Sequence, residues 1–386
     1  MADSALEGIR VVELTHAIAG PHCGQILADH GADVIKVEPP SGERTRGALP
    51  VVDGESLYFA CHNRGKRSIV LDLKSPDGTA HLHELVRRAD VLLTNYSADV
   101  PQRLGWGYER VREMNPGIVM VHITGFGSTG PDRGLLAYDG IIQAMSGVAE
   151  LTGTQESGPV FVGAFVADHI AAYQAALGAM FALHRRARTG EGAFVDISML
   201  DAYSGTLAHE IGEALAGRPH VRAGNGVPTA FANTFPTTDG HIYLAPLGED
   251  RWQAFCRAIG QLGWIGELTY DDAISRRREE AEKHVAEWCA SRSRTDITEL
   301  MRAAGVPCGP VWSAEERARH AADSGRGAIS EVRSPAGRAL TVPGPVSAVG
   351  LTISPRRAWV PALGEHTAEV LAELRTACPP EEGTSR

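Results

Sequence analysis

Short runs of β-branched residues alternate with helix-like patterns through about the first 200 residues, and no other feature constrains the fold as strongly. The strand-like runs span residues 9–14, 33–38, 68–73, 90–94 and 118–124. Helical spacing of apolar residues separates them at 21–30, 76–89 and 108–114. Such alternation is typical of βαβ units, so the sequence predicts an α/β fold with a parallel sheet and helices on both of its faces.

The character of the sequence changes after two further helical patterns, one from Asp168 to Thr189 and one from Met199 to Ala216. A Gly/Pro-rich stretch follows at 217–228, and the next hundred residues or so combine short strand-like runs with charged helical segments. A final amphipathic helix pattern spans 365–374. We therefore predict the N-terminal part of a large domain at 1–215, a small α+β domain at 216–328 and a C-terminal return to the large domain at 329–386.

Composition and charge narrow the functional classes. The 386 residues are 43% hydrophobic and 22% charged, as in ordinary globular proteins. A net charge of −10 opposes binding to nucleic acid or anionic membranes, so neither partner is expected. The longest apolar stretch, 170–183, is interrupted by Tyr173 and Gln174 and predicts no membrane span. Because no secretory leader and no Cys-x-x-Cys pair are visible, we expect a cytoplasmic protein with reduced thiols.

Two motifs invite functional interpretations that their surroundings do not favour. Residues 125–130 match the glycine spacing of a dinucleotide-binding loop, but the following Pro-Asp-Arg-Gly predicts a turn rather than the required helix. His16, His22 and His30 crowd one predicted strand–helix turn together with Cys23. No carboxylate–histidine pattern accompanies them, so no metal site is predicted.

Asp168 follows an apolar, small-residue approach to the longest helical pattern. One interpretation is structural, because aspartate often binds the free N–H groups at the start of a helix. The other is catalytic, since a carboxylate held near a helix N-terminus would suit a nucleophile that must stay ionised. Periodicity alone leaves both interpretations open.

Several segments, in order along nearly the whole chain, resemble the class III coenzyme A transferases and the related α-methylacyl-CoA racemases. The segments that carry this resemblance are residues 14–21, 31–38, 63–74, 89–92, 124–131, 161–170, 189–192 and 361–367. The resemblance implies a Rossmann-like large domain built from both chain ends, a smaller inserted domain and an interlocked homodimer. It also matches Asp168 to the catalytic aspartate of the family.

The chemistry that this resemblance implies moves coenzyme A from an acyl-CoA thioester to a carboxylic acid. Asp168 would form a mixed anhydride with the acyl group and then an aspartyl-CoA thioester, with no tightly bound cofactor. By position within the motifs, the residues implied to contact coenzyme A are Ala17, Ile18, Ala19, Arg46, Leu71, Lys74, Asn95, Tyr96, Ser97, Arg103, Tyr138 and Asp139. Lys66 is a further candidate for a phosphate contact.

Two other functions remain open beside transfer. The racemases that share this fold use a histidine to deprotonate the α-carbon, but this chain has Tyr138 at that place, and tyrosine is a poor base at neutral pH. A non-catalytic binder of CoA thioesters is the third possibility, although binding alone does not require Asp168. The sequence also departs from oxalate-using relatives at Ile18 and Pro39, and the apolar Ile18 favours a less polar acyl group.

Overall fold

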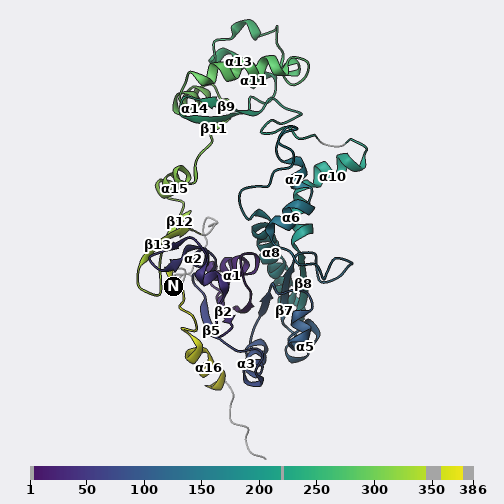
Figure 1. The fold of residues 1–386 in the computed structure, drawn as a ribbon, viewed down its shortest axis with the longest axis vertical. Helices are drawn as coiled ribbons and strands as arrows, with labels where there is room; N and C mark the ends of the chain where they lie inside the picture. Colours follow the sequence, from purple (N-terminus) through teal and green to yellow (C-terminus); the bar gives the residue numbers. More distant parts are fainter. Residues whose placement is uncertain (1–3, 219–220, 345–357, 377–386) are drawn as a thin grey trace, which may run out of the picture. The chain divides into compact units, whose positions relative to one another are not determined.

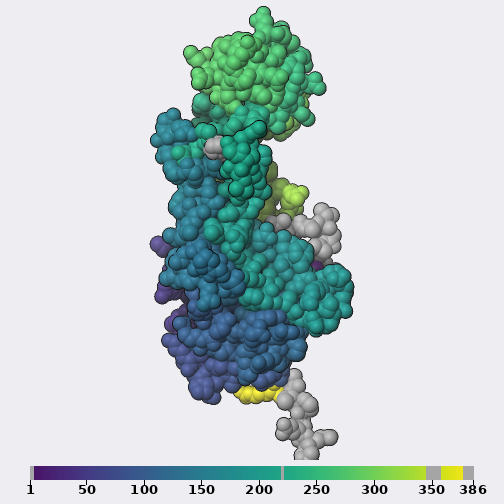
Figure 2. All heavy atoms as spheres, turned by 90° about the vertical axis from the view of Figure 1, so that its right-hand side faces the viewer, coloured from purple at the N-terminus to yellow at the C-terminus, as the bar shows by residue number. Residues whose placement is uncertain are grey.

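The computed structural model describes residues 4–218, 221–344 and 358–376. Within it the chain forms two compact units, one comprising residues 1–148, 161–212 and 321–386, and the other 149–160 and 213–320. In the space-filling view the green atoms of the second unit gather into one dense mass (Figure 2). The two units are described separately below.

The first unit is built on a six-stranded parallel sheet (Figure 1). Its strands are β1 (Arg10–Leu14), β2 (Asp33–Glu38), β5 (Arg67–Val70), β6 (Val91–Thr94), β7 (Val119–Thr124) and β8 (Ala193–Ser198). They lie in the order β5-β2-β1-β6-β7-β8, and each pairs in parallel with its neighbours. Counted along the chain this is the order 3-2-1-4-5-6 of doubly wound Rossmann folds. The predicted parallel sheet is thus confirmed.

Helices cover both faces of this sheet because neighbouring residues of each strand point to opposite sides. Val11 packs with α1 (Ala19–Asp29) and α8 (Val166–Thr189), whereas Val12 belongs to the core formed with α3 (Pro76–Arg87), α5 (Tyr108–Met114) and α16 (Thr367–Thr376). The last helix thus returns to the first unit, where it contacts β5 and α3 (Figure 1).

Helix α8 is the long central helix of the first core. By length and composition alone α8 could cross a membrane. The polar residues within its apolar stretch therefore argue against a membrane span less strongly than the sequence suggested. However, α8 contacts α1, β7 and β8, and one stripe of small side chains on it is fully buried. The stripe consists of Ala167, Ala171, Ala175 and Ala179. Small residues at this spacing let α8 lie close against its neighbours, as in the core helix of a globular protein.

Shorter elements complete the first unit. They are the 3₁₀ turn Arg44–Gly47, the hairpin strands β3 (Val51–Val52) and β4 (Glu55–Ser56), α2 (Leu57–Asn63), α4 (Val100–Arg103), α6 (Asp139–Met145), α9 (Met199–Ser204), β12 (Ile329–Arg333) and β13 (Ala339–Pro343). The helix predicted from 199 to 216 is wrong as a single element. It divides at a 3₁₀ turn, Gly205–Leu207, into α9 and α10 (Ala208–Leu215). Glycine has low helix propensity, which favours the break there.

The second unit has an antiparallel sheet of three strands, β9 (Asn233–Thr237), β10 (Gly240–Leu244) and β11 (Cys308–Pro310), in the order β11-β10-β9. Its helices are α11 (Glu249–Ala258), α12 (Tyr270–Ala273), α13 (Arg278–Ala290) and α14 (Arg294–Ala303), together with most of α7 (Val148–Leu151) and α15 (Ala314–Asp323). The unit boundaries fall within α7, α10 and α15, and only the last three residues of α10 belong to this unit. Phe231, Trp252 and Phe255 form the centre of its own hydrophobic core.

Candidate active site

A cavity of about 260 Å³ opens at the carboxyl ends of β1, β6 and β7. The crevice between β1 and β6 is the point where the strand order of the sheet reverses, and ligands of doubly wound sheets bind at such points. We call the cavity at this place the switch-point cavity. Its lining includes seven residues that the sequence singled out, Ala17, Asn95, Tyr96, Ser97, Tyr138, Asp139 and Asp168.

The turn between β1 and α1 forms one wall of this cavity. Ala17 adopts a positive φ of 61°, which is strained for a residue with a Cβ. Two interactions hold the turn in place: Asn95 exchanges hydrogen bonds of 2.9 and 2.8 Å with the backbone of His16, and the Ala17 amide donates to Glu43 Oε1 at 2.9 Å. Close packing requires Gly20, since a Cβ there would lie 2.6 Å from the Cβ of Thr15.

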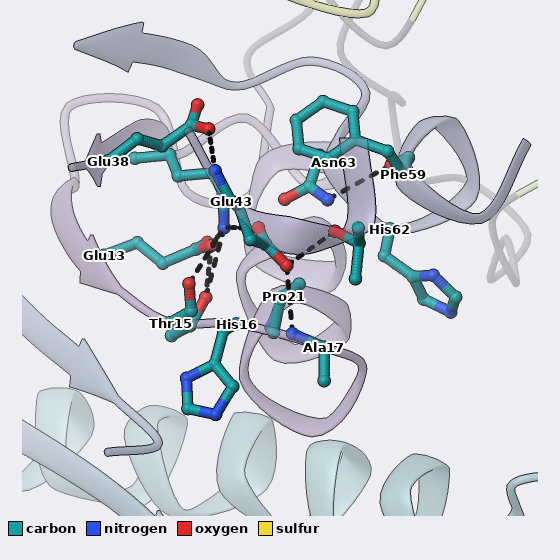
Figure 3. Close-up of polar contacts among 12 residues, drawn as sticks. Glu13, Thr15, His16, Ala17, Pro21, Glu38, Glu43, Phe59, His62 and Asn63 are labelled. Carbon is teal, nitrogen blue, oxygen red and sulfur yellow. Dashed lines mark hydrogen bonds and ion pairs between the residues drawn. The ribbon is translucent and has the colours of Figure 1, made fainter. Parts of the chain in front are cut away.

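A buried group of charged side chains lies next to this turn, and Glu43 connects the two (Figure 3). Lys36 Nζ lies 3.1 Å from Glu13 and 2.7 Å from Glu43, and Lys66 Nζ lies 2.8 Å from Glu13. Although burial opposes it, the carboxylates of Glu43 and Glu13 raise the pKa of Lys36 above its ordinary value. Glu43 therefore links the charged group directly to the Ala17 amide and fixes the cavity wall.

Asp168 lies in the first turn of α8, but its carboxylate accepts a hydrogen bond from the Ala19 amide at the start of α1. The amides at the start of α8 are bound instead by Asp139 Oδ2, which lies 2.9 Å from Ala167 N and 3.3 Å from Asp168 N. Burial and the nearby Asp139 carboxylate raise the pKa of Asp168 to about 7. Asp139 thus performs the capping role that the sequence allowed for Asp168, and Asp168 remains directed at the cavity.

Comparison with known proteins identifies the family. The sequence profile described as CoA-transferase family III matches residues 6–367. The chain belongs to CoA-transferase family III. It is 36% identical to the succinate–glutarate CoA-transferase of Agrobacterium fabrum and 35% identical to the succinyl-CoA:mesaconate CoA-transferase of Haloarcula hispanica, in both cases over 96% of each chain. These matches confirm the predicted class III CoA-transferase.

A solved structure supports the same assignment. A CAIB/BAIF family protein from Brucella suis superposes with a TM-score of 0.86 at 31% identity, covering 96% of this chain and 100% of that one. The mixed α/β fold of this CoA-transferase is therefore that of its family. Its glycine-rich segment 125–130 is a turn in which Ser128 N donates to the Asp196 carboxylate, and the next helix begins only at Asp139. This geometry does not provide the helix that a dinucleotide-binding loop needs.

The remaining residues implied to contact coenzyme A do not line the cavity. Ile18 and Ala19 are buried at the start of α1, and Leu71 is buried in the core on the opposite face of the sheet. Lys74 and Arg103 are exposed. Nothing in this structure supports a role of Ile18 in shaping the acyl site, because its side chain is only 1% exposed and does not line the switch-point cavity.

Two predicted phosphate contacts are occupied by internal partners. The Arg46 guanidinium lies 2.6 and 2.7 Å from the carboxylate of Glu38 and stacks over Phe59 at 4.0 Å. Lys66 Nζ is fully buried and bonds Pro21 O and Asn63 Oδ1 in addition to Glu13. Neither cation is free to bind a phosphate in this structure.

The cavity also contains residues that the sequence interpretation missed. Tyr58 and Phe165 lie on its wall, and the Asp168 carboxylate contributes to raising the pKa of Tyr58 to about 12, behind the larger effect of burial. Tyr58 belongs to α2, which was not predicted. Ser56 caps that helix by accepting a hydrogen bond from Phe59 N, and serine before an apolar run is the signal that could have revealed it.

Proposed function

We propose that this CoA-transferase exchanges coenzyme A between small dicarboxylic acids, with Asp168 as the nucleophile. The observation that carries the proposal is the position of the Asp168 carboxylate, which borders the switch-point cavity and is held by the Ala19 amide. A helix N-terminus favours the ionised form, while the cavity gives a thioester access to it. The family membership supports the same role.

The proposed reaction proceeds in balanced steps. An oxygen of the Asp168 carboxylate attacks the thioester carbonyl of the donor, the C–S bond breaks, and CoA leaves as a thiolate. The thiolate then attacks the aspartyl carbonyl of the mixed anhydride, which releases the donor acid as a carboxylate and leaves an aspartyl-CoA thioester. The acceptor carboxylate reverses both steps, so that acceptor-CoA forms and Asp168 is regenerated.

The size and lining of the cavity support small acyl groups. Drug-sized ligands occupy pockets of about 300–1,000 Å³, so a cavity of about 260 Å³ suits the thioester and a short acyl chain rather than a whole nucleotide. Arg133 lines it and supplies a cation for a second carboxylate. Two relatives act, by their names, on succinate and glutarate or on succinyl-CoA and mesaconate, which are four- and five-carbon dicarboxylates.

Quenched mass spectrometry of the protein incubated with acetyl-, succinyl- and glutaryl-CoA tests this proposal. We expect a CoA or acyl adduct on the peptide that contains Asp168, formed fastest from the dicarboxylyl donors. The epimerase alternative predicts exchange of the α-hydrogen of a branched acyl-CoA in deuterated water and no adduct. Binding of every donor with neither signal would indicate a non-catalytic binder and refute the proposal.

The pH dependence of the reaction should report the ionisation of Asp168. Because only the carboxylate is nucleophilic and its pKa is raised to about 7, we expect kcat/KM in metal-free buffer to rise with pH and level off above about pH 7. Asp139→Asn removes a neighbouring carboxylate that raises this pKa, so its profile should shift to lower pH. Identical profiles for the two proteins would contradict the assignment.

We also propose that the enzyme is a cytoplasmic homodimer whose two chains interlock. The exposed apolar side chains of Leu177 and Phe181 on α8 support a further interface, since their exposed fractions are 50% and 70%. The described cysteines are free thiols, as expected in a reducing compartment. Light scattering coupled to size-exclusion chromatography would give a monomer mass if the dimer proposal is wrong.

A further inference from the structure

Three histidines from three different helices meet beside the switch-point cavity. His22 lies on α1, His62 on α2 and His169 on α8, and one ring nitrogen of each lies within 4.8 Å of the other two. The ring centroids are 4.8 Å apart for His22 and His169, 5.7 Å for His22 and His62, and 5.6 Å for His62 and His169. We call this group the histidine cluster.

The hydrogen bonds of the cluster use one ring nitrogen of His62 and one of His169 and leave the second nitrogen of each ring available. His62 Nδ1 lies 2.8 Å from the Tyr58 carbonyl oxygen, and His169 Nδ1 lies 2.7 Å from the Phe165 carbonyl oxygen. A carbonyl only accepts, so Nδ1 carries the proton in both rings and Nε2 keeps a lone pair. This is the arrangement in which metal-binding histidines are usually held, with the second ring nitrogen fixed by a backbone carbonyl.

His22 differs from the other two histidines because, among the described residues, no backbone group binds either of its ring nitrogens. Both of its ring nitrogens are buried, and neither has a hydrogen-bond partner among the described residues. A buried polar atom without a partner costs about 1–3 kcal/mol, so an unpartnered imidazole indicates a missing ligand. The nearby cations do not oppose a metal ion strongly, because Lys66 is paired with Glu13 and Arg64 with Asp29.

We propose that the histidine cluster binds a divalent transition-metal ion, Zn²⁺ in the cell, with water as the fourth ligand. Imidazole is a preferred ligand of Zn²⁺, and three protein ligands with one open position is a recurring geometry. Zn–N distances of about 2.1 Å in a tetrahedron place ligand nitrogens about 3.4 Å apart. His22, whose ring nitrogens have no hydrogen-bond partner among the described residues, can approach this spacing by turning about χ2, which is a soft torsion for histidine.

The proposed ion connects the helices that form one side of the active site. The Ala19 amide of α1 holds Asp168, and the carbonyls that orient His62 and His169 belong to Tyr58 and Phe165, which line the switch-point cavity. A bound ion would therefore fix α1, α2 and α8 relative to one another. We infer a positioning and stabilising role, because none of the three histidines lines the cavity itself.

Equilibrium dialysis of the EDTA-treated protein against ZnCl2, followed by elemental analysis, tests the site. We expect one zinc per chain in the wild type and a rise in its melting temperature with zinc concentration. His22→Gln should bind zinc at least tenfold more weakly and lose the rise. His184→Gln is the matched control, since His184 is an exposed residue of α8 outside the cluster, and it should behave as the wild type.

Cobalt distinguishes this site from binding to a cysteine. The visible spectrum of the Co²⁺ protein should show tetrahedral bands without thiolate charge transfer, which excludes Cys61 next to His62 as a ligand. Should His22→Gln fail to fold, the partly exposed His169→Gln takes its place, with a circular dichroism melt as the check. Absence of stoichiometric zinc in the wild type, or equal uptake by the cluster variants, would overturn the proposal.

Discussion

Replacing Asp168 with asparagine is expected to lower the rate of CoA transfer on the order of 10⁴-fold or more, as does loss of an essential nucleophile in other enzymes. The amide cannot form an acyl anhydride with the donor. Its side-chain oxygen can still accept the hydrogen bond that the carboxylate receives from the Ala19 amide. The variant should therefore bind acyl-CoA while forming no covalent adduct, which initial rates and mass spectrometry measure side by side.

Stability separates this catalytic loss from unfolding. The folded-state pKa of Asp168 is raised to about 7, so ionising this side chain destabilises the folded protein progressively as pH rises from the unfolded value of about 4 toward 7. The asparagine variant lacks this penalty and should gain stability over the wild type between pH 5 and pH 8. Urea unfolding of both proteins at pH 5 and at pH 8 measures this gain in stability. Asp201→Asn, at an exposed position on α9, is the matched control and should retain activity.

A retained rate in Asp168→Asn would remove Asp168 from the reaction, whatever its effect on stability. A loss of activity accompanied by an unfolding transition at lower urea would support the structural interpretation of Asp168 instead. The catalytic and the structural interpretation of Asp168 therefore predict different results both for the transfer rate and for the urea unfolding transition.

The sequence predicted the part of the site that follows strand ends. Two segments follow strand ends: residues 95–97 come directly after β6, and Ala17 lies just after β1. Because the carboxyl ends of parallel strands lie at the same edge of a sheet, the predicted order of strands and helices places these residues together. Asp168 entered the candidate site for a different reason, because the family resemblance favoured the catalytic interpretation that periodicity had left open beside a structural one. Strand β8 was missed because it is a partly exposed edge strand that carries Asp196 among its apolar residues.

Pairing between distant side chains could not be predicted from local patterns. Arg46 and Lys66 look like free cations in the sequence, but Glu38 and Glu13 neutralise them in the fold. The histidines show the same limit. The sequence grouped His16, His22 and His30 by proximity along the chain, whereas the structure places His22 with His62 and His169. His30 instead bonds the Ile26 carbonyl of its own helix.

Replacing Lys36 with methionine is expected to lower the free energy of unfolding by about 3–5 kcal/mol, the cost of breaking a buried ion pair by removing one partner. Lys36 is fully buried and pairs with Glu13 and Glu43, and it also donates to Thr15 O at 3.2 Å. Methionine fills a similar volume but leaves the buried carboxylates facing the single ammonium of Lys66. Urea denaturation measures the difference, and Lys74→Met at an exposed site should stay within about 0.5 kcal/mol of the wild type.

The same substitution should also weaken substrate binding, because Glu43 holds both Lys36 and the Ala17 amide. Without its ammonium partner the buried Glu43 carboxylate is expected to move toward water, and this movement would alter the wall of the switch-point cavity. We therefore expect KM for acyl-CoA to rise together with the loss of stability. A large loss of stability with an unchanged KM would mean that Asn95, through its bonds to His16, holds the turn alone. A loss of less than about 1 kcal/mol in the free energy of unfolding would mean that water reaches the carboxylates and that the charged group is open to solvent.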